Sequence, residues 1–157
     1  YVFASENYGW KLADILEAEF VPVNLARSIT SISATEIRKD PIKNWQFLPA
    51  CVQPFYVKKV CIFGPESTGK STLASQLAAK FNTVAVPEYA RELLESQQGK
   101  IEFADINKIA RGQLASEKAL SRQANRLLFC DTDLLLTTIW SETLFNKITM
   151  IFIYLQI

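Results

Sequence analysis

The sequence predicts an α/β fold in which a parallel sheet is covered by helices on both faces. From residue 57 onward, short apolar runs alternate with longer segments of helical periodicity, and nearly continuous apolar strands are typical of buried parallel sheets. A loop containing two glycines joins the first of these runs to a helix. The same alternation, in a shorter form, opens the chain as strand, helix and strand.

The expected elements follow from the apolar periodicity along the chain. Strands are expected at residues 1–6, 20–25, 57–63, 83–87, 126–131 and 148–155. Helices are expected at residues 8–20, 70–81, 103–126 and 134–145, with two more beginning near residues 33 and 88. Ser33 and Glu36 have the spacing of a capping box, in which both side chains satisfy free amides of a helix start.

Composition and charge indicate no macromolecular partner. Hydrophobic residues make up 49% of the 157 residues, and 17 basic against 16 acidic side chains leave a net charge of +1. This balance gives no electrostatic reason to expect nucleic acid or an anionic membrane. The apolar run 148–157 has about half of the roughly 20 residues that a membrane-spanning helix needs, which favours a buried strand. No charged and then apolar leader opens the sequence, so we expect a cytoplasmic protein.

The chain has no histidine and three cysteines, Cys51, Cys61 and Cys130. Without histidine, this polypeptide has no Ser-His or Cys-His nucleophile pair and no histidine metal site. Cys61 and Cys130 lie in apolar runs and form no CxxC pair. Buried, reduced thiols are therefore expected at these two positions.

The loop after the strand 57–63 matches the phosphate-binding pattern GxxxxGK[ST] without a gap. Its residues are Gly64, Pro65, Glu66, Ser67, Thr68, Gly69, Lys70 and Ser71, followed by Thr72. In such a loop the glycines let backbone amides turn toward phosphate oxygens, and the positive end of the next helix faces the same anion. Lys70 is expected to reach the β and γ phosphates of ATP, and Ser71 to offer its hydroxyl to Mg²⁺. The alternative is a glycine turn that binds nothing.

Charged side chains follow two of the expected strands, at the sheet edge where the glycine loop also lies. Asp131 ends an apolar strand, a position typical of a magnesium-binding carboxylate, and is expected to bind magnesium or to accept the proton of a substrate hydroxyl. Asp133 is either a substrate contact or the N-cap of the helix 134–145. Glu88 and Arg91 begin a helix after the strand 83–87, so both side chains are expected to face a substrate. The alternative is an ion pair on the helix surface worth about 0.2 to 0.5 kcal/mol. Trp140 is expected in the core, with stacking on a flat ring as the alternative.

Five segments carry a resemblance to a known family. They are VFASENYG at 2–9, ISATEIR at 32–38, the loop and its flanks at 56–73, VPEYAREL at 86–93 and FCDTDLLLTTIWSE at 129–142. In this order they resemble the NadR family, in which a nicotinamide-nucleotide adenylyltransferase is joined to a ribosylnicotinamide kinase. The segments together span most of residues 1–145.

The resemblance implies a domain organisation. Residues 57–157 resemble a truncated nucleoside kinase domain of the NadR AAA type, with a P-loop kinase-type sheet and flanking helices, preceded by a linker at 51–56. Residues 1–50 resemble the last part of a Rossmann-like adenylyltransferase domain. There Ser33, Thr35 and Arg38 match positions that contact ATP phosphates, and a capped surface helix is the alternative. The HxGH motif of such transferases has no counterpart, because the chain has no histidine.

The resemblance also implies residue roles and a reaction. Glu88 is assigned to nucleoside or magnesium contacts and Arg91 to orienting phosphate or substrate. Lys70, Asp131 and Glu88 are then the expected catalytic residues, and Glu88, Arg91 and Asp133 the expected substrate-binding residues. The implied reaction is ATP-dependent phosphorylation of ribosylnicotinamide to nicotinamide mononucleotide in NAD biosynthesis, with ATP and Mg²⁺ as cofactors and a small nucleoside as partner.

Two further hypotheses stay open. The chain begins at Tyr1, has Met150 as its only methionine and ends in an apolar run, so we expect a piece of a longer protein. The lid arginines that the resemblance implies after the last strand are missing from the 157 residues, so a catalytically incomplete ATP-binding module or regulatory fragment is the alternative. Adenylyl transfer to nicotinamide mononucleotide is the third hypothesis.

Overall fold

The computed structural model describes residues 1–26, 28–29 and 32–147. The chain divides into two compact units, Tyr1–Phe47 and Leu48–Ile157, and this division falls a few residues before the linker expected at 51–56. The strand expected at 148–155 lies outside the described residues. Among the helices that the structure describes, none is both long and apolar enough to cross a membrane.

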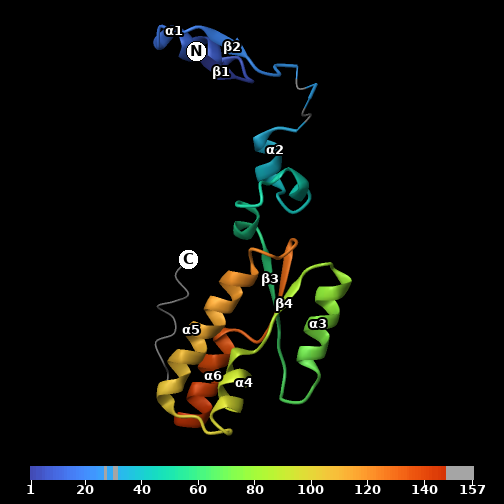
Figure 1. The fold of residues 1–157 in the computed structure, drawn as a ribbon, viewed down its shortest axis with the longest axis vertical. Helices are drawn as coiled ribbons and strands as arrows, with labels where there is room; N and C mark the ends of the chain where they lie inside the picture. Colours follow the sequence, from blue (N-terminus) through green and yellow to red (C-terminus); the bar gives the residue numbers. More distant parts are fainter. Residues whose placement is uncertain (27, 30–31, 148–157) are drawn as a thin grey trace. The chain divides into compact units, whose positions relative to one another are not determined.

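The first unit begins with a small parallel β-α-β arrangement, as expected. Strands β1 (Val2–Ala4) and β2 (Phe20–Pro22) pair in parallel, and helix α1 (Tyr8–Ile15) connects them (Figure 1). A Cβ atom at Gly9 would lie 2.3 Å from the Phe20 ring and 2.8 Å from the Ala4 Cβ. Glycine is therefore required where α1 rests on the two strands. The buried face of α1 carries Gly9 and Ala13, while the larger apolar side chains of this helix are exposed.

A capping box starts the second helix of this unit, α2 (Ala34–Lys39). The Glu36 backbone N–H donates to the Ser33 hydroxyl at 3.1 Å, and the Ser33 backbone N–H donates to the Glu36 carboxylate at 2.8 Å. The helix start predicted at Ser33 is confirmed. A 3-10 turn, η1 (Trp45–Phe47), ends the unit.

The second unit is a three-stranded parallel sheet with helices on both faces, which confirms the predicted fold class. After a 3-10 turn, η2 (Gln53–Phe55), its elements are β3 (Lys58–Ile62), α3 (Lys70–Lys80), β4 (Val84–Val86), α4 (Tyr89–Ser96), α5 (Phe103–Leu120), β5 (Leu127–Asp131) and α6 (Leu134–Phe145). The strand order is β3-β5-β4. The chain thus passes from β3 to β4 and returns to place β5 between them (Figure 1). This order brings the end of β5 beside the loop that follows β3.

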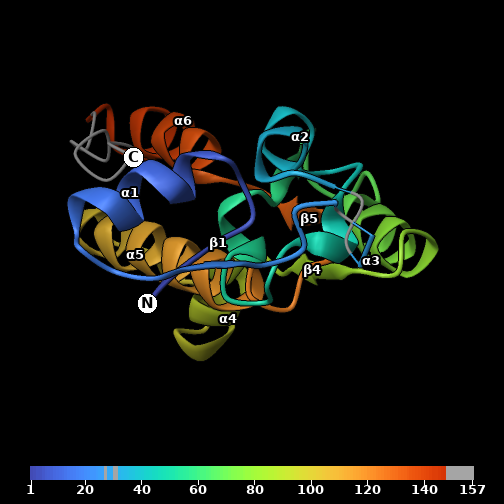
Figure 2. The same cartoon turned by 90° about the horizontal axis from the view of Figure 1, so that it is seen from above.

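The central strand β5 alternates its side chains between two apolar layers. Leu128 and Cys130 pack with Val86 and the end of α5, whereas Phe129 packs against Ala74 and Ala78 of α3. Figure 2 shows the strands between α3 on one side and α5 and α6 on the other. Each layer uses every second residue of the strand, as the pleat requires.

Helix α3 buries its small residues rather than its large ones. Ala74 and Ala78 are 1% and 6% exposed, whereas Leu73 and Phe81 are each 47% exposed. Alanines at these positions let the helix approach the Phe129 ring closely. The helix predicted at residues 70–81 is present, and its buried face is centred on the two alanines.

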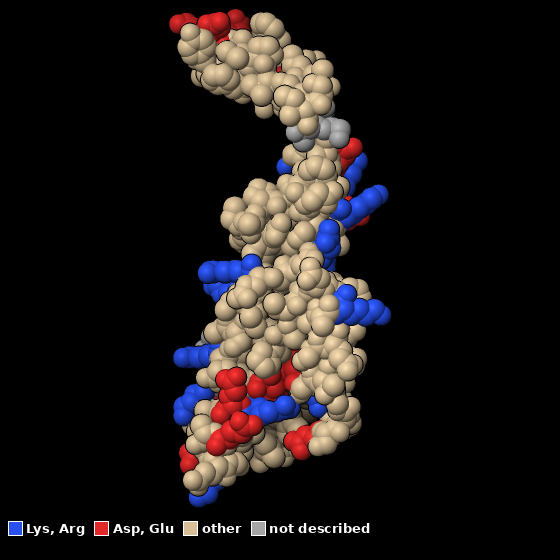
Figure 3. Space-filling view, turned by 45° about the vertical axis from the view of Figure 1, so that its right-hand side comes forward, with Lys and Arg blue, Asp and Glu red and all other residues tan. Residues whose placement is uncertain are grey.

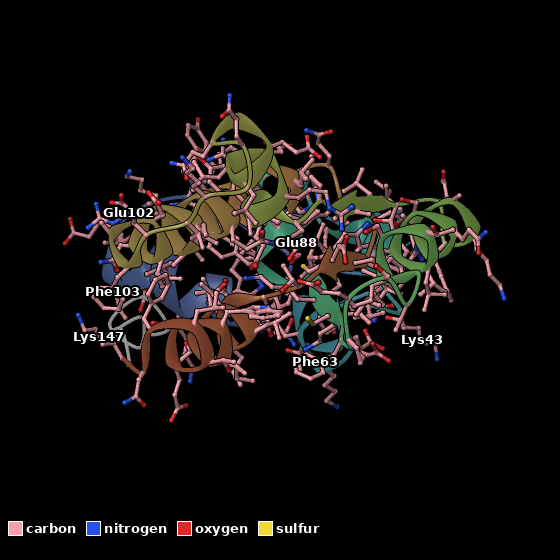
Figure 4. The ribbon with its side chains drawn as sticks, turned by 90° about the horizontal axis from the view of Figure 1, so that it is seen from below. Lys43, Phe63, Glu88, Glu102, Phe103 and Lys147 are labelled. Atoms are coloured by element: carbon pink, nitrogen blue, oxygen red, sulfur yellow. The ribbon has the colours of Figure 1, made fainter. Side chains whose placement is uncertain are left out.

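The outer layer is formed by α5 and α6. Ile106 and Ala110 of α5 pack with Leu134 of α6. At the far end of this contact the rings of Phe103 and Phe145 meet edge to face at 5.8 Å, and Lys147 lies 4.9 Å from the centre of the Phe103 ring (Figure 4).

Candidate functional site

The loop between β3 and α3 has the backbone of an anion-binding turn. The φ angle is +153° at Gly64, +58° at Ser67 and +84° at Gly69. Glycine adopts such angles without the strain that a Cβ atom causes, so the loop can curl at both glycines. Gly69 is also the N-cap residue of α3 and supplies no side chain to its first turn. The amides of that turn and the positive end of the helix dipole therefore face the loop.

Lys70 opens α3 and folds back over the loop. Its Nζ donates to the Pro65 carbonyl at 2.6 Å, and the Thr68 hydroxyl donates to the same oxygen at 2.8 Å. The acceptor of the lysine ammonium is thus a neutral carbonyl. A phosphate oxygen would offer it a stronger, charge-assisted hydrogen bond, so the position of Lys70 suits its predicted role.

Asp131 ends β5 and is the register partner of Ile62, just before the phosphate loop. It is 3% exposed, and its Oδ1 is buried with no hydrogen-bond partner among the described residues. The following residue, Thr132, is also buried and has φ +90°. A β-branched residue with this angle is strained, and strain of this kind clusters at functional sites.

These residues fit a magnesium ion that is bound together with nucleotide phosphates. Ser71 lies in the first turn of α3 and Asp131 at the end of the neighbouring strand. No group of three or more carboxylate or cysteine side chains within the described ranges could hold a metal by itself. Magnesium commonly binds one or two protein oxygens and takes its other ligands from phosphates and water. The unpartnered Oδ1 of Asp131 is the kind of oxygen that such an ion would use.

Asp133 has a structural role in this edge of the sheet. It is the N-cap of α6, where its carboxylate accepts the Leu136 backbone N–H at 3.0 Å. Burial, followed by the charge of Asp133, raises the pKa of the Cys61 thiol to about 12. Burial, followed by the charge of Glu117, raises the pKa of the Cys130 thiol to about 12. Both thiols are free, as predicted, but Cys130 is buried and Cys61 only partly buried. A substrate contact of Asp133 stays a prediction.

Glu88 and Arg91 form an ion pair at the start of α4. Glu88 is the N-cap residue, and its carboxylate lies 3.2 Å from the Arg91 guanidinium. The Arg91 side chain is 55% exposed and that of Glu88 23%. Figure 4 labels Glu88 at this helix start and Phe63 at the beginning of the phosphate loop. The surface ion pair weighed as an alternative is therefore present, and it does not exclude contact with a ligand.

One cavity of about 280 Å³ connects the phosphate loop with the start of α4. The cavity is lined by the phosphate loop, by the Glu88–Arg91 ion pair and by apolar side chains of α4 and α6. The lining residues are Gly64, Glu66, Ser67, Lys70, Glu88, Arg91, Leu94, Glu95, Leu136 and Trp140. On the face shown in Figure 3, acidic and basic side chains of this unit lie next to each other. A cavity with basic, acidic and apolar walls can hold a polar ligand that also has a flat ring.

The cavity brings together only part of the predicted site. Six of the predicted positions line it, namely Gly64, Glu66, Ser67, Lys70, Glu88 and Arg91. Asp131 and Asp133 do not line it, and neither do Pro65, Thr68, Gly69, Ser71 and Thr72 of the loop. In the first unit, Ser33 uses its hydroxyl in the capping box, while Thr35 and Arg38 are exposed. Their predicted phosphate contacts stay a prediction.

Four residues of the cavity were not assigned to it from the sequence. Trp140 was expected in the core, with stacking on a flat ring as the alternative, and it is only partly buried and lines the cavity. The other three are Leu94, Glu95 and Leu136. Residues 88, 91 and 95 recur at helical spacing, so this signal in the sequence would have indicated Glu95 as well.

Comparison with known proteins assigns the chain to a family. A family described as AAA domain matches residues 59–152. The chain belongs to the AAA domain family. The chain is also similar to two proteins named Trifunctional NAD biosynthesis/regulator protein NadR. It is 39% identical over 126 residues to the protein of Escherichia coli (strain K12). It is 38% identical over 126 residues to the protein of Salmonella typhimurium (strain LT2). The matched part is 78% of this chain and 31% of each relative, so the chain spans about a third of their length.

Solved structures of NadR resemble the AAA domain chain over most of its length. A crystal structure of NadR protein in complex with NAD and AMP-PNP has a TM-score of 0.75 and 25% identity, covering 88% of this chain and 41% of the other. A crystal structure of NadR protein in complex with NR has a TM-score of 0.77 and 25% identity, covering 91% of this chain and 42% of the other. The resemblance to the NadR family and the α/β class are thereby confirmed.

Proposed function

We propose that this AAA domain chain transfers the γ-phosphoryl group of ATP to a ribose hydroxyl of ribosylnicotinamide, giving ADP and nicotinamide mononucleotide in NAD biosynthesis. The observation that carries the proposal is that the phosphate loop and the start of α4 line one and the same cavity. A phosphoryl donor and an acceptor hydroxyl must be held together in this way to react. NadR structures in complex with AMP-PNP and with NR support the choice of donor and acceptor.

The donor side is the phosphate loop. Backbone amides of the loop and of the first turn of α3 would hold the β and γ phosphates, with the Lys70 ammonium drawn from the Pro65 carbonyl to a phosphate oxygen. The Ser71 hydroxyl and the Asp131 carboxylate would hold Mg²⁺. When bound with ATP, this ion neutralises charge that develops on the transferred phosphate.

The acceptor side is the wall formed by α4 and α6. Glu88 is suited to accept a hydrogen bond from a ribose hydroxyl, and Arg91 to orient the phosphate or the nucleoside. Trp140 lines the same cavity and presents an aromatic ring on which a pyridine ring can stack.

The reaction needs no covalent enzyme intermediate. The ribose oxygen attacks the γ phosphorus, the bond from this phosphorus to the bridging oxygen breaks, and ADP leaves with the electrons of that bond. The proton of the attacking hydroxyl passes to a carboxylate, for which Glu88 and Asp131 are the two candidates. Positioning and charge neutralisation then supply most of the catalysis.

We also propose the domain assignment that follows from the NadR relatives. Residues 57–157 would form the kinase domain, residues 51–56 the linker, and residues 1–50 a remnant of an adenylyltransferase domain in which Ser33, Thr35 and Arg38 contact phosphate. The protein would act in the cytoplasm on a small nucleoside.

The test is a phosphoryl-transfer assay with the full chain, radiolabelled ATP, Mg²⁺ and ribosylnicotinamide. Labelled nicotinamide mononucleotide is the expected product. Lys70→Ala should lower kcat by about 10²- to 10³-fold, the usual loss when one donor that stabilises transition-state charge is removed.

Lys80→Ala is the matched control, because Lys80 is an exposed lysine at the opposite end of the same helix. It should leave kcat unchanged. If Mg-ATP binds and no product forms in any variant or in the wild type, the kinase proposal is wrong and the ATP-binding module is the function that stands.

A further inference from the structure

Gln113 connects two elements of the candidate site by hydrogen bonds, although it does not line the cavity itself. It lies in α5 and is 1% exposed. Its Oε1 accepts the Tyr89 backbone N–H at 3.0 Å, and its Nε2 donates to the Thr132 carbonyl at 3.5 Å. One buried amide side chain thus joins the first residue of α4 to the residue that follows β5.

Each partner of Gln113 is next in sequence to a residue of the proposed chemistry. Tyr89 follows Glu88, and its amide is one of those that a helix start leaves without a partner inside the helix. Thr132 follows Asp131 and has φ +90°. A threonine stays in such a conformation only where its surroundings hold it, and the bond from Gln113 to its carbonyl is one such restraint.

The neighbouring residue of α5 supports the same end of α4. A Cβ atom at Gly112 would lie 2.3 Å from two atoms of the Tyr89 ring. The ring therefore rests directly on the backbone of α5, while Gln113 holds the backbone of Tyr89. Two adjacent residues of α5 thus contact the first residue of α4.

Gln113 does not line the cavity, so substrate contact does not explain its presence. A buried amide is favourable only when its hydrogen bonds are made, and both ends of this one are used between elements. If either partner moved away, a buried polar group would be left without a hydrogen bond, which is costly. Both partners are therefore held at hydrogen-bond distance from Gln113. A glutamine with this pair of contacts sets the separation of two segments.

We propose that Gln113 is a positioning residue for phosphoryl transfer, which holds Glu88 and Asp131 in the relative placement that the reaction needs. The inference rests on the proposed kinase function. It assigns Gln113 no contact with ATP, with ribosylnicotinamide or with Mg²⁺.

The test compares Gln113→Leu and Gln113→Met with Glu117→Gln in the full chain. Glu117 lies one turn further along α5, is 5% exposed, and pairs with Lys59 of β3 at 2.8 Å, so it is a buried polar control away from the α4 contact. We expect both Gln113 variants to lower kcat by about 10- to 100-fold and to raise the KM for ribosylnicotinamide, as displaced catalytic groups do. The Kd for Mg-ATP, measured by calorimetry, should change less than kcat does, because the phosphate loop and Lys70 stay in place while Asp131 is displaced.

Glu117→Gln should lower the thermal midpoint and leave kcat and both KM values within about twofold of wild type. Gln113 variants that behave like Glu117→Gln in the kinetics would overturn the inference. Gln113→Met is close to glutamine in length and volume, so it carries the test if Gln113→Leu does not fold. Failure of both to fold would show a purely structural requirement and would also overturn the inference.

A second measurement separates this inference from the kinase proposal. Amide hydrogen exchange at Tyr89 should be at least about tenfold faster in Gln113→Met than in Glu117→Gln, because the acceptor of that amide is lost. If the wild type forms no product, the kinase proposal fails and the role in phosphoryl transfer fails with it, and the exchange at Tyr89 then decides only whether Gln113 holds the start of α4. Equal exchange in the two variants would refute the positioning role.

Discussion

At the scale of single residues, the buried carboxylate of Asp131 is unfavourable for stability. Its carboxylate is almost fully buried, and Oδ1 has no hydrogen-bond partner among the described residues. An unsatisfied buried polar atom costs about 1 to 3 kcal/mol, and more when the group is charged. A residue retained at such a cost is typical of a ligand site, where function and stability oppose each other.

Asp131→Asn should therefore separate activity from stability. Removal of the buried charge is expected to raise the free energy of unfolding by on the order of 1 kcal/mol, while product formation falls by about 10²-fold or more. Urea denaturation without nucleotide and the phosphoryl-transfer assay measure the two quantities. Glu142→Gln, at an exposed position of α6, is the control and should change neither. A less stable Asp131→Asn would contradict the argument from the unpartnered oxygen.

At the scale of elements, α5 supports the site from outside the cavity, through the contacts of Gln113 with Tyr89 and Thr132. Its own start is held by side-chain hydrogen bonds. The Glu102 backbone N–H donates to Asp105 Oδ2 at 3.0 Å, and Lys108 Nζ donates to Asp105 Oδ1 at 2.8 Å. The hydrogen bond from Lys108, followed by that from Glu102, holds the pKa of Asp105 below its ordinary value of 3.8. The same pair raises the pKa of Lys108. The start of α5 thereby anchors the helix that contains Gln113.

Asp105→Asn should change how stability depends on pH. Because the pKa of Asp105 is lower in the folded chain than in the unfolded chain, its carboxylate stabilises the fold above pH 3.8, and this contribution is lost as pH falls through the folded pKa. The variant should be less stable than wild type at neutral pH, and the difference should shrink in strong acid. Urea denaturation of both proteins between neutral pH and strong acid measures this difference in the free energy of unfolding.

Lys108→Gln provides the companion variant for this prediction. It removes the partner that contributes most to the lowered pKa of Asp105. The free energy of unfolding of the double variant should then fall by less than the sum of the two single decreases, because both substitutions remove the same interaction. Additive losses, or a pH dependence identical to wild type, would show that the pair at the start of α5 does not stabilise the helix.

At the scale of the whole molecule, the strand order explains where the site forms. β5 lies between β3 and β4, and all three run in parallel. The carboxyl ends of the strands therefore meet at one edge. The phosphate loop follows β3 there, Glu88 follows β4, and Asp131 is the last residue of β5. Ligands of open parallel sheets bind at such an edge.

Nucleotide binding should consequently stabilise the second unit as a whole. At a free Mg-ATP concentration 100 times the Kd, the free energy of unfolding should rise by about 2.7 kcal/mol. The thermal midpoint with and without Mg-ATP measures this gain. Lys70→Ala should reduce the gain sharply and Lys80→Ala should keep it. An unchanged midpoint in the wild type at millimolar Mg-ATP would contradict the proposed nucleotide site.

Local patterns in the sequence predicted most of the elements, because each depends on neighbours in the chain. The capping box at Ser33, the glycine loop at 64–71 and the apolar strands 57–63 and 126–131 are all read within a few residues, and all appear in the structure. The cap at Asp133 was one of two alternatives, since an aspartate before a helix suits both roles. The effect of its charge on the pKa of Cys61, which lies 72 positions earlier in the chain, was outside the reach of any local pattern.

The sequence by itself determined the α/β class, the phosphate loop with Lys70, and the carboxylates that follow the strands, since hydrophobic period, glycine spacing and strand ends are properties of short segments. Only the tertiary structure decided which of these residues share a cavity, that Trp140 lines it, that Asp131 keeps an unpartnered oxygen, and that Gln113 spans from Tyr89 to Thr132. The physical reason is that burial and hydrogen-bond partners between α4, α5 and β5 depend on how these elements pack, and packing joins residues that the chain holds far apart.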